Sequence, residues 1–155
     1  MRKFNLIISA FVFFAALLLQ SCSESPVQNT ESRELLFNLD GVIEEVGGDC
    51  SAVQVRTRSF GEFNLSDYSK LRFEFDGMSD ADLSSISLFY YENGEIVFLV
   101  NLVNRDEINS TDFAEVNSPG IQREIFSRVT LKSSVCTGQI FFLSFRDLKI
   151  FGVRQ

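Results

Sequence analysis

The chain has 155 residues, of which 45% are hydrophobic and 23% are charged, and its net charge is −7 at pH 7. An acidic chain without a basic cluster repels phosphate backbones, so we expect no nucleic acid partner. The sequence contains no His, the commonest general base and transition-metal ligand, and no Trp, which stacks well on sugar rings.

The N-terminal segment has the pattern of a targeting signal. Arg2-Lys3 precedes a run of sixteen mostly apolar residues, 4–19, whereas a membrane-spanning helix needs about 20. The run closes in Leu18-Leu-Gln-Ser-Cys22, and the whole pattern resembles the signal peptide of a bacterial lipoprotein. The resemblance implies that residues 1–21 are removed and that Cys22 carries lipid. An uncleaved anchor helix, or an ordinary secretory signal with a chance cysteine, is the alternative.

Lipidation of Cys22 implies a cell-envelope protein held at a membrane, because several acyl chains anchor a protein stably. By resemblance to Gram-negative lipoproteins, Ser23 is compatible with the outer membrane. Residues 22–33 are polar and lack periodicity, so we expect them to form a flexible tether. Residues 34–155 are then expected to form a single domain. Removal of the signal would leave 12 basic and 21 acidic residues, so the mature chain is strongly acidic.

From residue 34 onward the pattern predicts strands. Residues 35–39 form a short apolar run before an expected turn at Asp40-Gly41. Alternation of apolar and polar residues, typical of a half-buried strand, recurs in three places. The apolar positions in these places are Val53 and Val55; Leu71, Phe73 and Phe75; and Ile125, Val129 and Leu131.

Asn93-Gly94 separates two strand-like runs and is the strongest local signal of a β-hairpin. A two-residue turn pairs Glu92 with Glu95, Tyr91 with Ile96 and Phe89 with Phe98. Continued along both strands, this register predicts one face made of Ser87, Phe89, Tyr91, Ile96, Phe98, Val100 and Leu102. The other face carries Ile86, Leu88, Tyr90, Val97, Leu99 and Val103. Both faces are apolar, so the hairpin is either covered on both sides or presents an exposed aromatic face.

The C-terminal run, residues 139–153, changes phase. Its apolar residues occupy odd positions up to Phe145 and even positions from Leu148, so the change falls near Arg146-Asp147. A bulge, or a strand that changes sheets, produces such a switch. About eight short strands without a helical stripe predict an all-β fold, an antiparallel two-sheet sandwich.

Cys50 and Cys136 are the cysteines that remain after lipidation, which is too few for a cysteine-based zinc site. In an oxidising compartment, two such residues predict one disulfide. Two separate buried thiols are the alternative.

Two segments resemble galactose-binding-like jelly rolls and related carbohydrate-binding modules. Asn64-Leu-Ser-Asp-Tyr-Ser-Lys-Leu-Arg-Phe-Glu-Phe-Asp-Gly77 is similar to their Asp-Leu-Ser-x-Tyr segment and the alternating strand after it. Phe142-Leu-Ser-Phe-Arg-Asp-Leu-Lys-Ile-Phe-Gly152 is similar to their closing strand. The resemblance spans about residues 34–153 and implies a jelly roll. The missing Trp departs from many sugar-binding members.

Phe89, Tyr91 and Phe98 form the first candidate site. Sugar rings stack on aromatic faces, and neighbouring polar side chains can bind their hydroxyls. The alternative is that these residues fill the core of a Trp-free sandwich.

Calcium is the metal that the sequence allows, and no other cofactor is expected. Jelly rolls of this resemblance often hold a structural calcium between the first and last strands, and Asp147 with Asp40 and Glu44 or Glu45 would suit that role. Alternatively, Asp147 marks the bulge. The three carboxylates within residues 76–82 are a further candidate, with an ordinary solvated loop as the alternative.

Catalysis is not expected. The chain lacks a Gly-x-Ser-x-Gly nucleophile motif, and no spacing singles out a pair of carboxylates for hydrolysis. The favoured function is a non-catalytic, lipid-anchored envelope protein whose β-sandwich binds a glycan. The alternative is a structural or assembly lipoprotein that binds another protein.

Overall fold

The computed structural model describes residues 31–104 and 108–154. Within these ranges the chain forms eight β-strands and no helix. Accordingly, no helix in the described part of the chain is long and apolar enough to cross a membrane. The strands are β1 (Ser32–Gly48), β2 (Gln54–Asn64), β3 (Lys70–Ser79), β4 (Ser85–Glu92), β5 (Glu95–Asn104), β6 (Ile108–Asn117), β7 (Gln122–Leu131) and β8 (Phe141–Arg154).

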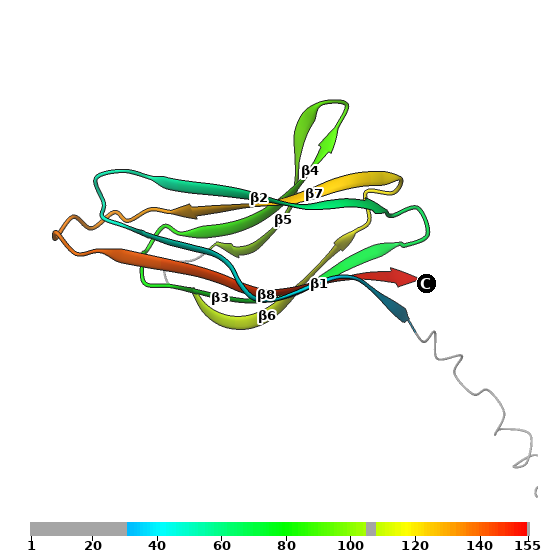
Figure 1. The fold of residues 1–155 in the computed structure, drawn as a ribbon, viewed down its shortest axis with the longest axis horizontal. Helices are drawn as coiled ribbons and strands as arrows, with labels where there is room; N and C mark the ends of the chain where they lie inside the picture. Colours follow the sequence, from blue (N-terminus) through cyan, green and yellow to red (C-terminus); the bar gives the residue numbers. More distant parts are fainter. Residues whose placement is uncertain (1–30, 105–107, 155) are drawn as a thin grey trace, which may run out of the picture. The chain divides into compact units, whose positions relative to one another are not determined.

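The strands build two four-stranded antiparallel sheets that face each other (Figure 1). Sheet A has the order β1-β8-β3-β6, and sheet B has the order β2-β7-β4-β5. Every connection crosses from one sheet to the other, except the β4–β5 hairpin. The predicted all-β sandwich is therefore confirmed, and this strand order is compatible with an eight-stranded jelly roll.

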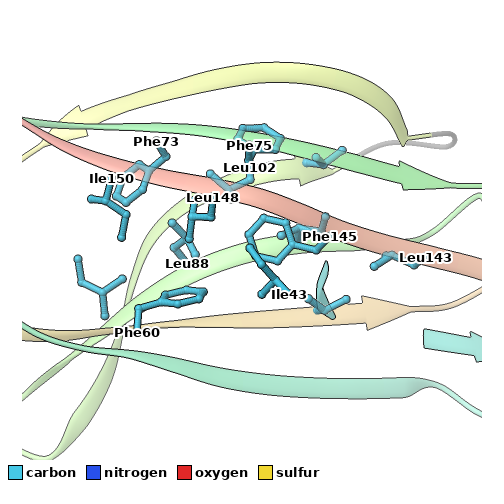
Figure 2. Packing of buried hydrophobic residues seen from close by; sticks show 14 of the residues in the cluster. Ile43, Phe60, Phe73, Phe75, Leu88, Leu102, Leu143, Phe145, Leu148 and Ile150 are labelled. Carbon is cyan, nitrogen blue, oxygen red and sulfur yellow. The ribbon is translucent and has the colours of Figure 1, made fainter. Parts of the chain in front are cut away.

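The core fills the space between the sheets. In β3 the apolar positions point inward, so Leu71, Phe73 and Phe75 are buried while the residues between them are half-buried. Figure 2 shows side chains of both sheets meeting, with Phe73 and Ile150 on one side and Phe60 and Leu88 on the other. The alternation read at Leu71, Phe73 and Phe75 is thus the division between core and surface. At Val53 and Val55 the same prediction is wrong, because these residues are 51% and 44% exposed, and Val55 lies on the outward side of sheet B.

The expected turn at Asp40-Gly41 is wrong, because β1 continues through these residues to Gly48. Gly41 has φ 90°, and the pairing with β8 shifts register between Leu39 and Val42. A bulge, in which one strand carries an extra residue, explains both observations. The Asp-Gly pair bends one long strand instead of ending it.

The phase change near Arg146-Asp147 is also a bulge, and β8 stays in sheet A throughout. Asp147 has φ 53°, a left-handed conformation that Asp tolerates better than most residues. Its Oδ1 accepts a hydrogen bond of 2.5 Å from the backbone N–H of Gly41. The two bulges therefore face each other and are joined by this hydrogen bond.

The predicted hairpin turn is confirmed, with Glu92 opposite Glu95, Tyr91 opposite Ile96 and Phe89 opposite Phe98. Asn93 and Gly94 take the positive φ values, 53° and 83°, that such a turn requires. On the side of Phe89 that is farther from the turn, however, two register shifts interrupt the pairing of β4 with β5.

These register shifts overturn the predicted positions of Val100 and Leu102. Asn101, not Val100, lies opposite Ser87, and Val100 lies opposite the inward-facing Leu88. Leu102 is 9% exposed and belongs to the core. The bulges shift the register at the end of β5 by one residue, so the side chains there face the other way. The aromatic face therefore ends at Phe98.

The predicted disulfide is confirmed. Cys50 and Cys136 are bonded, with 5.3 Å between their Cα atoms, and they join the β1–β2 loop to the β7–β8 loop. Asp82, from the β3–β4 connection, accepts hydrogen bonds from the N–H and the hydroxyl of Ser134. One end of the sandwich is therefore held by a covalent link and by a hydrogen-bonded carboxylate.

Candidate functional site: the aromatic face of sheet B

Four aromatic rings gather on the outer face of sheet B. Phe126, on β7, lies between Phe89 of β4 and Ser59 of β2 in the pairing of the strands. The rings of Phe89 and Tyr91 stack on Phe126, with centroids 5.6 Å and 4.9 Å away. Phe98 meets Phe89 edge-on at 5.7 Å. We call Phe89, Tyr91, Phe98 and Phe126 the aromatic platform.

The outermost rings of the aromatic platform are open to solvent. Tyr91 is 43% exposed and Phe98 is 54% exposed, whereas Phe126 is only 5% exposed because the other rings cover it. The three residues predicted from the hairpin register, Phe89, Tyr91 and Phe98, lie together on the outward face. They are therefore not part of the core between the sheets, which was the alternative to a ligand site for these residues.

A hollow of about 330 Å³ lies beside the aromatic platform. β4 pairs with β7 only as far as Tyr90, so the tip of the β4–β5 hairpin leaves the sheet and stands clear of it (Figure 1). The tip forms one wall of the hollow, β7 the floor and β2 the other wall. The lining residues are Thr57, Arg58 and Ser59 from β2, Glu124, Phe126 and Arg128 from β7, and Tyr91 and Ile96 from the hairpin.

The polar groups of the hollow include both donors and acceptors. The guanidinium of Arg128 lies 4.9 Å from the centre of the Phe89 ring and has no ion-pair partner among the described residues. Glu124 accepts a hydrogen bond of 2.6 Å from the hydroxyl of Ser59. Arg58 donates to the carbonyl of Ile43 at 2.8 Å. Arg128 is therefore the cation with the most donors left for a ligand.

An ion pair holds the hairpin against β7. The Nη2 atom of Arg123 lies 2.5 Å from Oε1 of Glu92, and its guanidinium lies 5.5 Å from the centre of the Tyr90 ring. The Arg123 side chain is only 11% exposed. A well-packed, partly buried pair of this kind fixes the position from which Tyr91 projects.

Phe126 and Arg128 were not predicted from the sequence as part of this site. In β7 the residues of odd number, such as Ile125 and Val129, face the core, so Phe126 and Arg128 face outward. The alternation of β7 could have shown that they share a face. Their closeness to the hairpin depends on β7 lying beside β4, which no local pattern shows.

The residues proposed for calcium do not converge. Asp147 binds the N–H of Gly41, and Asp40 accepts a hydrogen bond of 3.2 Å from Asn38. In the second candidate, Asp80 accepts a hydrogen bond of 2.6 Å from the N–H of Phe142, and Asp82 binds Ser134. Within residues 31–104 and 108–154, no group of three His, Cys, Asp or Glu could hold a metal ion. Calcium binding stays an untested prediction.

The lipidation residue Cys22 lies outside the described residues, as does the signal segment. β1 begins at Ser32, so Ser32 and Arg33, placed in the tether by the sequence, pair with Arg154 and Val153. The last two residues of the expected tether are thus part of sheet A.

Neither a scan against protein-family models nor a search of curated proteins finds a match to this chain.

Proposed function

We propose that this domain is a non-catalytic glycan-binding module, carried by a lipoprotein of the cell envelope. The observation that carries the proposal is the aromatic platform, with Tyr91 and Phe98 exposed beside a hollow that contains both hydrogen-bond donors and acceptors. Tyr91 and Phe98 are left open to water, and a ligand that covers these two rings would gain hydrophobic stabilisation.

The chemistry of a sugar ring matches this surface. Its apolar face of C–H groups can stack on Tyr91 and Phe98, and its hydroxyls can accept from Arg128 and donate to Glu124. Tyr91 also carries a phenolic hydroxyl, which gives this ring a polar edge. The volume of about 330 Å³ lies at the lower end of the range of small-molecule sites, which suits one or two sugar units.

The finer features of the proposal come from the sequence. The strand order supports the resemblance of residues 64–77 and 142–152 to galactose-binding-like jelly rolls. The resemblance of residues 1–22 to a lipoprotein signal supports a lipid anchor at Cys22 and a location at the outer membrane of a Gram-negative cell. Together these features describe a binding surface held at a membrane on a short tether.

A protein ligand is the second candidate function. Ile96 is 47% exposed and stands with Phe98 on the projecting hairpin, and exposed apolar side chains of this kind also occur at protein interfaces. An assembly lipoprotein that binds another envelope protein would use the same face. Crosslinking of the full chain in its native envelope, from a photoreactive group placed at position 98, distinguishes the two candidates. A protein ligand would form a covalent adduct there, whereas a glycan-binding module would form none with another protein.

The direct test titrates the full chain with neutral and acidic oligosaccharides and measures binding by calorimetry. We expect Tyr91→Ala and Phe98→Ala to weaken binding about tenfold each, because a stacked aromatic ring contributes about 1.5 kcal/mol. Phe113→Ala is the matched control, since Phe113 is 51% exposed but lies on the outer face of sheet A. Equal affinities of Phe98→Ala and the wild type, or no binding to any oligosaccharide, would contradict the proposal.

A further inference from the structure

The opposite face of the sandwich carries a second hollow. It has a volume of about 370 Å³ and lies on the outer face of sheet A. Its lining comes from three adjacent strands: Glu45 of β1, Asp76 and Met78 of β3, and Phe142, Ser144 and Arg146 of β8. None of these residues belongs to the aromatic platform.

The floor of this hollow contains a hydroxyl that the fold does not use. Ser144, on the central strand β8, has Glu45 on one side and Met78 on the other. The side chain is buried, with 3% of the residue exposed, and its Oγ has no hydrogen-bond partner in the described part of the chain. A buried hydroxyl without a partner destabilises the fold. A ligand seated in the hollow would supply the missing hydrogen bond.

The charged residues around Ser144 likewise have no ion-pair partner in the described part of the chain. Asp76 and Arg146 are directly opposite each other in the pairing of β3 with β8, an arrangement in which opposite charges normally attract. They form no ion pair, and neither does Glu45, among the residues that the structure describes. Elsewhere on the same face, Arg72 binds both Glu74 and Glu115. The residues of the hollow thus keep their hydrogen-bonding capacity, unlike their neighbours.

We infer that this hollow is a second binding site, whose ligand is a neutral, hydroxyl-rich molecule of the size of a short oligosaccharide. A hydroxyl both donates and accepts, so it can bind the carboxylates of Glu45 and Asp76 as well as the guanidinium of Arg146. Met78, which is 48% exposed, and Phe142 supply apolar walls for the C–H face of a ring. Two carboxylates against one guanidinium disfavour an acidic ligand.

The arrangement of the charged groups favours a polyhydroxyl ligand over a single ammonium group. Glu45 and Asp76 lie on strands at either side of β8, so their backbones are separated by two strand spacings, roughly 10 Å. Arg146, on the strand between them, disfavours a cationic ligand in the same hollow, whereas the hydroxyls of a sugar can bind groups of either charge. The site on sheet A differs in this way from the aromatic platform, and its existence does not depend on that platform binding anything.

The test follows backbone amide signals of the full chain by NMR, during titration with neutral hexasaccharides of glucose, galactose and xylose. We expect the signals of Ser144 and Glu45 to shift in the wild type and in Tyr91→Ala, whose aromatic platform is impaired. Ser144→Ala and Glu45→Gln should each weaken this binding about fivefold, because the first removes a hydrogen bond and the second removes the charge that strengthens one.

Ser127→Ala is the matched control. Ser127 is likewise buried and without a partner for its Oγ, but its residue number places it on the core side of β7, away from both hollows. Ser127→Ala should therefore leave the affinity unchanged. Binding that disappears in Tyr91→Ala, or that is equal in Ser144→Ala, Glu45→Gln and Ser127→Ala, would overturn the second site while leaving the proposed function standing. Signals that shift near Ser144 but not on the aromatic platform would overturn the proposed function and leave the second site standing. Binding at neither face would overturn both.

Discussion

The ring of Tyr68 occupies the space beside the backbone of Gly152 that a side chain at Gly152 would need. The N–H of Ser69 donates to the carbonyl of Val153 at 2.9 Å, and the guanidinium of Arg154 lies 4.8 Å from the centre of the Tyr68 ring. Tyr68 and Gly152 belong to the two segments whose sequences resemble galactose-binding-like jelly rolls. The contact therefore explains why both residue types occur where they do.

Replacement of Gly152 tests this contact. Gly152→Ala should lower the free energy of unfolding by about 2 kcal/mol, because a Cβ would overlap the Tyr68 ring and force β8 or the ring to shift. Urea unfolding followed by circular dichroism measures the change. Gly47→Ala is the control, since a Cβ there meets nothing closer than the Phe141 carbonyl at 3.9 Å. If the two variants were equally stable, the contact would not constrain the fold.

The hydrogen bond between Asp147 and Gly41 predicts a graded series of variants. Asp147→Ala should cost about 2 kcal/mol, because it removes the acceptor and leaves Ala at φ 53°. Asp147→Asn should cost less than half of that, since Asn tolerates this conformation and keeps an oxygen acceptor. Thermal unfolding of the three proteins provides the ranking. An Asn variant as unstable as the Ala variant would show that the negative charge, and not the geometry, matters.

The disulfide links residues 86 positions apart. On the chain-entropy account, its loss in the Cys50→Ser/Cys136→Ser double variant should lower the free energy of unfolding by about 4 kcal/mol. Guanidinium unfolding of the double variant, beside wild type with and without reductant, measures this. Reduced wild type should match the variant. A difference below about 1 kcal/mol between oxidised and reduced wild type would mean that the loops are held without the bond.

The contact of Asp82 with Ser134 predicts a pH dependence. Hydrogen bonds from Ser134, mainly from its hydroxyl and secondly from its N–H, hold the pKa of Asp82 below its ordinary value of 3.8. A carboxyl with a lowered pKa in the folded state contributes stability above the unfolded pKa, and this is lost as the pH falls through the folded pKa. The melting temperature of wild type should therefore exceed that of Asp82→Asn at pH 6, and the gap should close below about pH 4. A gap that stays constant to pH 2.5 would contradict this assignment.

The ion pair between Arg123 and Glu92 predicts where the hairpin loosens. Arg123→Ala should speed amide hydrogen exchange in residues 90–97, because the hairpin tip has no pairing with β7 beyond Tyr90. Under the proposed function it should also weaken glycan binding. Arg56→Ala is the control, since among the described residues its guanidinium binds only the carbonyl of the adjacent Val55. Unchanged exchange in the hairpin would show that stacking on Phe126 alone holds it.

Local patterns predicted the parts of the fold that short-range physics determines. Asn93-Gly94 requires positive φ at two successive residues, and a hairpin follows from that alone. The alternation around Phe73 likewise follows from one face meeting the core. The Asp40-Gly41 bulge was read as a turn because the same residues suit both. Only the pairing of β1 with β8 distinguishes them.

The candidate site divides in the same way. Phe89, Tyr91 and Phe98 share a face through the hairpin register, and the sequence alone predicted that. Phe126 reaches them because sheet B places β7 beside β4, an arrangement set by the order of strands far apart in the chain. The hollow at Ser144 needs β1, β3 and β8 side by side. For this reason no motif in the sequence points to it.

The position of β8 also sets when the domain can fold. β8 is the last strand of the domain to be synthesised, yet it lies between β1 and β3 and pairs with both. Sheet A cannot form completely before β8 has been synthesised, because β8 is the strand that pairs with β1. Contacts of such long sequence separation form slowly. Sheet A is therefore incomplete until β8 has been synthesised, and such a delay in folding would favour export of the proposed lipoprotein across a membrane.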